Sequence, residues 1–168
     1  MDFESCLKLV LKHEGGFVNH PKDPGGATNR GVTQATYDGW RSGRNLAPRS
    51  VRLITDREVS AIYRRDYWDA VRADDLPSGV DYAVFDFAVN SGVSRASRFL
   101  QEACGAHQDG KIGPATVAAV KKVAARSVVI RLCEARLHFL QSLKTWSTFG
   151  KGWGSRVAEV KEAALRAC

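Results

Sequence analysis

The stretch EGGFVNHPKDPGGATNRGVT, residues 14–33, is the most unusual part of this 168-residue chain. It is dense in Gly, Pro, Asn and Asp, which favour turns, and it shows no helical periodicity. Four apolar residues before it recur at helical spacing: Phe3, Leu7, Val10 and Leu11. We therefore expect a first helix that ends near Glu14, followed by a small β-hairpin or loop flap over residues 17–33.

The remainder of the chain is helical by pattern. Capping residues and apolar positions at helical spacing predict seven further helices. They are expected at about 33–40, 55–67, 79–90, 94–103, 114–125, 127–143 and 155–167. The sequence contains no tandem repeat and no low-complexity tract. The fold class is therefore mainly α, and residues 1–168 are expected to form a single compact domain.

Composition narrows the class of protein further. With 44% apolar and 26% charged residues, the chain fits a globular domain. It has no apolar stretch long enough to span a membrane, and its first residues lack the pattern of a signal peptide. We expect a protein made in the cytoplasm without a signal peptide. The four cysteines show no metal or redox spacing, so free thiols are expected at Cys6, Cys104, Cys133 and Cys168.

The charge of the chain favours a polyanionic partner. The formal net charge is +7, and residues 81–168 carry 13 Lys and Arg against 7 Asp and Glu. Nucleic acid, an anionic membrane face and the bacterial cell wall all fit such a charge. Because the basic residues lack the accompanying pattern of a nucleic-acid module, we expect no nucleic-acid partner.

Two acids in the turn-rich stretch can form a catalytic pair. Glycoside hydrolysis needs a protonated carboxyl to protonate the leaving oxygen and a second group to position water or stabilise the transition state. Glu14, near the end of a helix, is expected to have a raised pKa, whereas Asp23, in a turn rich in backbone N–H groups, is expected to stay ionised. The alternative is that Glu14 is a surface residue and Asp23 only forms a turn.

The motif at residues 14–33 resembles the signature of glycoside hydrolase family 108, whose members are lysozyme-like N-acetylmuramidases of phages and bacteria. The resemblance covers most of the chain. It continues in YRRDYW at 63–68, DDLPSGVDYAVFDFAVNSG at 74–92, LQ at 100–101 and DGKIGPAT at 109–116. It implies a lysozyme-like helical fold with a catalytic part at 1–92 and a part resembling a peptidoglycan-binding region at 93–168.

The resemblance also implies roles for particular residues. Glu14 takes the place of the catalytic acid in the EGG motif. The spacing of Glu14, Asp23 and Thr28 resembles the Glu, Asp and Thr constellation of phage muramidases, but one residue fewer separates Asp23 from Thr28. Asn29 therefore occupies the alternative third position.

Other residues are candidates for contact with substrate. Asp86 lies in the apolar run VFDFAV, where an acid must be paired, so it is either a structural anchor or a cleft residue. Asn90 is either a helix cap or a substrate contact. Trp153 belongs to a Gly-rich aromatic segment, expected to be a loop, that either packs in the core or borders a glycan groove. His13 and His20 lack the spacing of a zinc site, so neither a metal nor another cofactor is expected.

These observations favour a peptidoglycan hydrolase that cleaves the β-1,4 bond between N-acetylmuramic acid and N-acetylglucosamine. The expected partner is the glycan strand of peptidoglycan, reached in the periplasm or cell wall through a holin or a secretion-system component, and the protein is expected to be a monomer. A non-catalytic wall-binding protein and a basic nucleic-acid binder are the alternatives from other classes.

Overall fold

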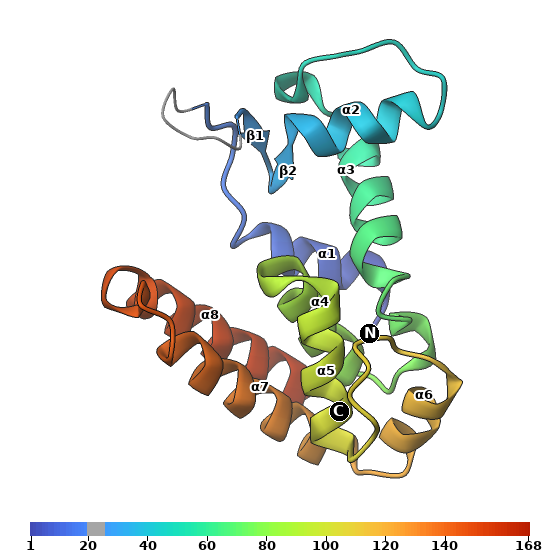
Figure 1. Cartoon of the computed structure of the whole chain (residues 1–168), viewed down its shortest axis with the longest axis vertical. Helices are drawn as coiled ribbons and strands as arrows, with labels where there is room; N and C mark the ends of the chain where they lie inside the picture. The colour runs from blue at the N-terminus through green and yellow to red at the C-terminus, as the bar shows by residue number, and fades with distance from the viewer. Residues whose placement is uncertain (20–25) are drawn as a thin grey trace. The chain divides into compact units, whose positions relative to one another are not determined.

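The computed structural model describes residues 1–19 and 26–168, and Asp23 therefore lies outside the described residues. The described chain divides into two compact units. The small unit comprises residues 4–65, and the large unit comprises residues 1–3 and 66–168. Helices dominate both units, and the described residues contain one two-stranded sheet (Figure 1). This architecture confirms the expected mainly α, lysozyme-like fold with a small β-hairpin.

The small unit holds the turn-rich stretch between short helices. Its elements are α1 (Phe3–Leu11), β1 (Thr28–Asn29), β2 (Val32–Thr33), α2 (Gln34–Ser42), the 3-10 turn η1 (Val51–Leu53) and α3 (Asp56–Tyr63). Phe3, the first residue of α1, belongs to the large unit. Two of the predicted helix caps, Thr33 and Thr55, are confirmed. The Thr33 hydroxyl accepts a hydrogen bond from the backbone N–H of Thr36 at 3.1 Å, and Thr55 and Glu58 form a capping box at the start of α3.

The β-hairpin has a two-residue turn. β1 and β2 pair antiparallel, with Thr28 opposite Thr33 and Asn29 opposite Val32. Arg30 and Gly31 connect them, both with positive φ (50° and 76°), as the type I′ turn typical of tight hairpins requires. Thr28 also forms a bridge with Val18, in which each N–H donates to the other residue's carbonyl at 2.8 Å.

The large unit is a helical bundle around α4 (Val80–Ser91). It also contains the π-helical turn η2 (Arg64–Trp68, which begins in the small unit), the 3-10 turn η3 (Ala73–Asp75), α5 (Val93–Cys104), α6 (Pro114–Lys121), α7 (Ala125–Gln141) and α8 (Trp146–Ala167). Every residue of α4 from 80 to 88 is buried, because α5, α7 and α8 pack around it. At its start, Gly79 has φ +86° and approaches α8 so closely that a Cβ would collide with Ala164 O.

The differences from the predicted element boundaries that bear on the site and on the bundle lie in α1, α7 and α8. α1 ends at Leu11, so Glu14 lies three residues beyond the helix rather than on its last turn. α7 was expected to begin at about 127, with Ser127 as its cap, but it begins at Ala125 with Ala124 at its N-cap. α8 begins at Trp146, so the segment containing Trp153 is helical and not a loop.

The compact units and the cysteines complete the description of the fold. The two units adjoin in the sequence at Arg65/Asp66, and α4 packs with the helices that follow it. All four cysteines are free thiols, and burial raises the pKa of Cys133 to about 11. None of the helices among residues 1–19 and 26–168 is long and apolar enough to cross a membrane.

Candidate active site

Glu14 is held in the small unit by the β-hairpin turn. Glu14 is half-buried and follows α1 after a short turn, in which the His13 N–H donates to Val10 O at 3.0 Å. A Cβ placed on Gly31 would lie 3.0 Å from Glu14 Oε2 and would collide with the Tyr63 hydroxyl. The side chains of Glu14 and Tyr63 therefore both lie beside Gly31, and only a glycine leaves room for both.

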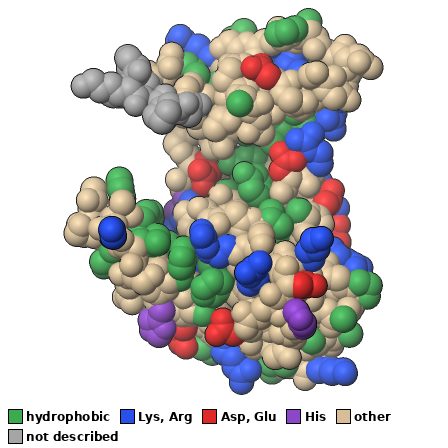
Figure 2. Space-filling model, viewed as in Figure 1, with side chains coloured by type: hydrophobic (Ala, Val, Ile, Leu, Met, Phe, Trp, Pro, Cys, Tyr) green, Lys and Arg blue, Asp and Glu red, His purple; other side chains and the backbone are tan. Residues whose placement is uncertain are grey.

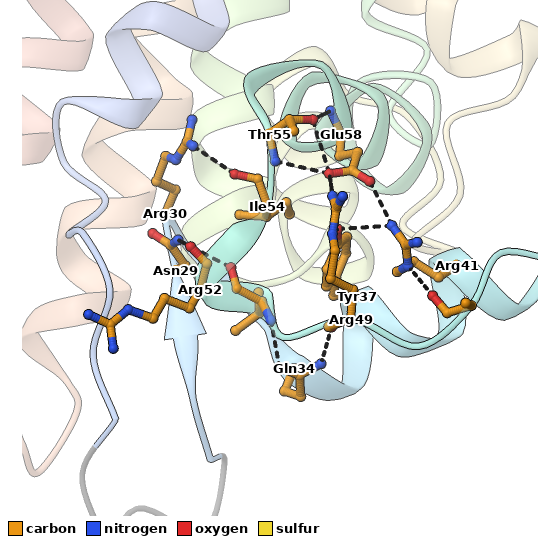
Figure 3. Close-up of polar contacts among 12 residues, drawn as sticks. Asn29, Arg30, Gln34, Tyr37, Arg41, Arg49, Arg52, Ile54, Thr55 and Glu58 are labelled. Atoms are coloured by element: carbon orange, nitrogen blue, oxygen red, sulfur yellow. Dashed lines mark hydrogen bonds and ion pairs between the residues drawn. The ribbon is translucent and has the colours of Figure 1, made fainter.

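Hydrogen bonds fix the position of the hairpin turn. The Tyr63 hydroxyl, at the end of α3, donates to Arg30 O at 2.8 Å. The Arg30 guanidinium donates to Ile54 O at 3.0 Å (Figure 3). It also forms an ion pair with Asp56. The turn is thus held between the end of α3 and the segment before it, and the surface that faces Glu14 is pre-organised.

Asn29 and Thr28 have different roles in the hairpin. Asn29 is only 8% exposed, and its Nδ2 donates to Val51 O and Arg52 O, each at 3.2 Å (Figure 3). Its side chain is therefore occupied in tying β1 to η1. Thr28 is half-buried and lies on the opposite face of the strand, because successive side chains alternate. Of the two alternatives for the third site residue, the geometry favours Thr28.

A buried polar cluster supports the hairpin from α2 and α3. Glu58 accepts hydrogen bonds from the Tyr37 hydroxyl at 2.9 Å and from Arg41 Nη1 at 2.9 Å, and it forms an ion pair with Arg49 (Figure 3). Burial alone would raise the pKa of Glu58, but hydrogen bonds from Thr55 and Tyr37 and the attraction of Arg49 outweigh it and lower the pKa. This carboxylate is therefore ionised and structural, which makes it a poor general acid.

Asp86 was expected to be either a structural anchor or a cleft residue, and it is buried in the large unit. It is 0% exposed, and its carboxylate forms ion pairs with Arg136 at 2.7 Å and Arg156 at 2.8 Å. Burial alone would raise the pKa of Asp86, but attraction and hydrogen bonds from the two arginines outweigh burial and hold the pKa below its usual range. Because this carboxylate has no exposed surface and two charged partners, its position favours the structural alternative, an anchor of α4, over contact with a glycan.

Asn90 and Trp153 both retain surface in the large unit. Asn90 is half-buried at the end of α4, where its Oδ1 accepts a hydrogen bond from Ser91 Oγ at 3.0 Å. Trp153 is half-buried on α8, with its ring 6.4 Å from that of Trp146 and 5.5 Å from that of Phe149. Phe149 is 52% exposed, so these aromatic rings form a partly open patch at the start of α8.

Tyr63 and Gly31 were not predicted as site residues. In the sequence, Tyr63 is one of the apolar positions of α3, and only the fold brings its hydroxyl to Gly31, beside Glu14. The signal for Gly31 was the sequence TNRGVT, in which a glycine ends a two-residue connection between short strands. No group of three His, Cys, Asp or Glu side chains that could hold a metal ion occurs among residues 1–19 and 26–168.

Comparison with known proteins places this geometry in a family. The family model described as Glycosyl hydrolase 108 matches residues 7–92, which include Glu14, the hairpin and Tyr63. The chain belongs to glycosyl hydrolase family 108. A second model, described as Predicted Peptidoglycan domain, matches residues 95–158. Together the two models identify this family 108 protein as a peptidoglycan hydrolase of the glycoside hydrolase class.

A solved structure supports the assignment over nearly the whole chain. SagA of Brucella abortus superposes with a TM-score of 0.86 at 50% sequence identity. The match covers 98% of this chain and 94% of SagA. No protein with a curated description matches the chain.

The contact over Gly31 gives a first prediction. Gly31→Ala adds a Cβ at φ +76° that must displace the Tyr63 hydroxyl and press on the Glu14 carboxylate. We expect activity on peptidoglycan to fall about tenfold or more and the free energy of unfolding to fall by about 1–3 kcal/mol. Turnover and urea unfolding measured on the same preparation test this.

Gly39→Ala is the matched control for that variant. A Cβ on Gly39, within α2, has no atom within 4 Å, so alanine should preserve activity and stabilise the helix slightly. If Gly31→Ala is as active as Gly39→Ala, the hairpin turn does not position Glu14.

Proposed function

We propose that this family 108 hydrolase is an N-acetylmuramidase of the lysozyme type (EC 3.2.1.17) that cleaves the β-1,4 bond between N-acetylmuramic acid and N-acetylglucosamine. Glu14 serves as the general acid that protonates the leaving oxygen. The observation that carries the proposal is the half-buried Glu14 carboxyl, held at a hairpin turn that its own motif encodes. A proton donor must be held in position while remaining open to the substrate, and this arrangement meets both needs.

Asp23 is the proposed base or electrostatic partner of Glu14. In the sequence it lies between Val18 and Thr28, the two residues that form the β-bridge beside the hairpin. Thr28, on the face of β1 opposite Asn29, is the proposed third polar group of the site. Its hydroxyl can donate to a water or to a sugar oxygen.

Product analysis tests the type of bond that is cleaved. Purified peptidoglycan is digested with the protein, and the muropeptides are identified by mass spectrometry before and after borohydride reduction. We expect products that end in reducing N-acetylmuramic acid. Anhydro ends would instead identify a lytic transglycosylase, and reducing N-acetylglucosamine would identify a different glycosidase. A complete lack of products would favour the alternative of a wall-binding protein without catalysis.

The aromatic patch of α8 is proposed to contact glycan. Trp153→Ala removes one face of the patch, and we expect the affinity for glycan fragments to fall about tenfold because sugar rings stack on such faces. Since Trp153 is only half-buried, the loss of stability should stay below the about 3–5 kcal/mol typical of a buried Trp. Fragment titration and thermal unfolding of one preparation measure both effects.

Trp68→Ala provides the comparison for this variant. Trp68 is 1% exposed and packs edge-on to Phe3 and Phe85, so its loss should cost about 3–5 kcal/mol. If Trp153→Ala destabilises the protein as much as Trp68→Ala and leaves fragment affinity unchanged, the patch belongs to the core and not to the substrate site.

The cellular setting follows from the substrate. Peptidoglycan is the substrate of this hydrolase, which fits action at the cell wall. The proposed site of action is the periplasm or cell wall. A holin or a secretion-system component is the proposed route to it, and the protein is proposed to act as a monomer. Asn90, at the end of α4, is a proposed further contact with peptidoglycan.

A further inference from the structure

A pocket of about 440 Å³ in the large unit begins beside Asn90, at Ser91, and none of the described candidate residues considered so far lines it. It is formed where α4 ends and α5 begins, with one wall from α7. Its polar lining comes from Ser91, Ser94, Arg95 and Arg98. The rings of Phe99 and Phe139, which meet edge to face at 5.8 Å, form its apolar wall.

The two arginines differ in how they are held. Arg95 donates to Ser91 O at 3.2 Å, and its guanidinium lies 4.5 Å from the centre of the Phe139 ring. These contacts fix its plane and leave most of its N–H donors open. Arg98, one helical turn further on, makes no hydrogen bond or ion pair with any of the residues that the structure describes. No acidic side chain is among the described residues that line the pocket.

The backbone adds further positive potential. Gly92, the N-cap of α5, supplies no side-chain cap, so the first N–H groups of this 12-residue helix stay open beside the pocket. Opposite them, Gly110 has φ +78° and lies so close that a Cβ would be 2.7 Å from Ser94 Oγ and 3.1 Å from Arg98 Nε. The close approach of Gly110 restricts Arg98. Figure 2 shows Lys and Arg side chains on the face of the large unit over α4 and α5.

The chemistry of peptidoglycan limits what such a pocket can bind. Its glycan strand is uncharged where the lactyl carboxyl of muramic acid is amide-linked to the stem peptide. The stem peptide itself carries free carboxylates. Arginine forms paired, charge-assisted hydrogen bonds with carboxylates, and apolar rings can pack against the short aliphatic parts of a peptide. Two open guanidinium groups therefore match the peptide and not the sugar.

We propose that this pocket binds a carboxylate of the peptidoglycan stem peptide, with Arg95 and Arg98 as the anion-binding residues. The proposal rests on the proposed function in one respect, because it takes peptidoglycan as the substrate. It assigns recognition of the stem peptide to the large unit, in addition to the cleavage of the glycan assigned to Glu14. The hydrolase would then prefer strands that carry peptides over bare glycan.

A binding experiment with two peptides tests the ligand chemistry. The probe is the tripeptide L-alanyl-γ-D-glutamyl-meso-diaminopimelate, labelled at its amino end, and the comparison is the same peptide with every carboxylate converted to carboxamide. We expect the wild-type protein to bind the acid form at least about tenfold more tightly than the amide form. Equal binding of the two peptides, or no binding, would overturn the proposal. Displacement of the peptide by an equal concentration of inorganic phosphate would identify a general anion site and would also overturn it.

Variants test the location of the site. Arg98→Gln and Arg95→Gln should each weaken binding of the acid peptide about tenfold. Arg131→Gln is the matched control. Arg131 is exposed on α7 and donates to the carbonyl oxygen of Ala103 at 3.2 Å, just as Arg95 donates to the carbonyl oxygen of Ser91 at 3.2 Å. Binding by Arg98→Gln that equals binding by Arg131→Gln would place the peptide elsewhere.

Hydrolysis assays separate this inference from the proposed function. On glycan strands freed of peptides by an amidase, with the exposed lactyl carboxyls then converted to carboxamides, Arg98→Gln should cleave as fast as wild type, whereas on intact peptidoglycan its KM should rise several-fold. If no protein cleaves either substrate, the muramidase proposal fails while the peptide-binding result still stands. If Arg98→Gln loses activity on both substrates equally, the pocket does not act through the peptide.

Discussion

Glu14→Gln should lower the rate of peptidoglycan hydrolysis by about two orders of magnitude or more. The amide keeps the shape and nearly the volume of the carboxyl, but it has no proton to transfer to the leaving oxygen. Packing against Gly31 and Tyr63 should persist, because it depends on shape. We therefore expect a nearly unchanged thermal midpoint together with the loss of activity, measured as the release of reducing sugar from purified peptidoglycan.

Glu4→Gln is the matched control for this change. Glu4 is an exposed residue of α1 in the same unit, and its carboxylate accepts a hydrogen bond from Ser60 Oγ at 3.1 Å. The control should keep nearly full activity. Release of reducing sugar by Glu14→Gln at a rate near that of Glu4→Gln would remove Glu14 from the role of general acid, whatever the stability of the two variants.

Local signals in the sequence predicted the helix ends that depend on local contacts. Thr33 and Thr55 accept hydrogen bonds from N–H groups three residues later, and Gly105 ends α5 in the left-handed conformation. These interactions need only neighbouring residues, so the pattern of the chain is sufficient to find them.

The start of α8 shows where local signals fail. Gly150, Gly152 and Gly154 disfavour a helix, and the segment was therefore expected to be a loop. The Trp146 ring lies directly on Gly150, where a Cβ would be only 2.6 Å from the indole, so this glycine lets an aromatic ring cover the helix surface. Packing of aromatic rings outweighs the low helix propensity of glycine here, and that packing is not visible in periodicity.

Only the part of the candidate site that lies in one continuous sequence motif could be predicted from the sequence. The EGG motif identified Glu14 by resemblance, and the Gly- and Pro-rich composition of residues 17–33 indicated a small hairpin or loop flap without the position of its turn. The approach of both Glu14 and Tyr63 to Gly31 joins residues from three separate segments, which no local pattern encodes. The buried acid in VFDFAV required a partner, but the partners that satisfy it lie 50 and 70 residues later in the chain.

Asp86→Ala should be among the most destabilising single changes in the large unit. It leaves Arg136 and Arg156, which are 1% and 8% exposed, without their shared counter-charge. Among the described residues, Nε and Nη2 of Arg136 already have no hydrogen-bond partner. Breaking a buried ion pair in this way costs about 3–5 kcal/mol, so we expect a fall of roughly 10 °C in the thermal midpoint.

The pH dependence of stability provides a second readout of the same cluster. Because the folded-state pKa of Asp86 lies below its unfolded value of about 3.9, its contribution is fully present above that pH and is lost as the pH falls through the folded pKa. Urea unfolding at neutral and at acidic pH should therefore show a smaller loss of stability on acidification for Asp86→Ala than for wild type.

Asp75→Ala separates burial from charge in this test. Asp75 forms an ion pair with Arg72 at 2.7 Å, but both side chains are substantially exposed, so its removal should cost about 1 kcal/mol or less. If Asp86→Ala is no less stable than Asp75→Ala and instead loses affinity for glycan, Asp86 is a substrate contact. Strong destabilisation with glycan affinity retained in the folded fraction would show that the two arginines and Asp86 serve to hold α4, α7 and α8 together, since each helix contributes one member of the cluster.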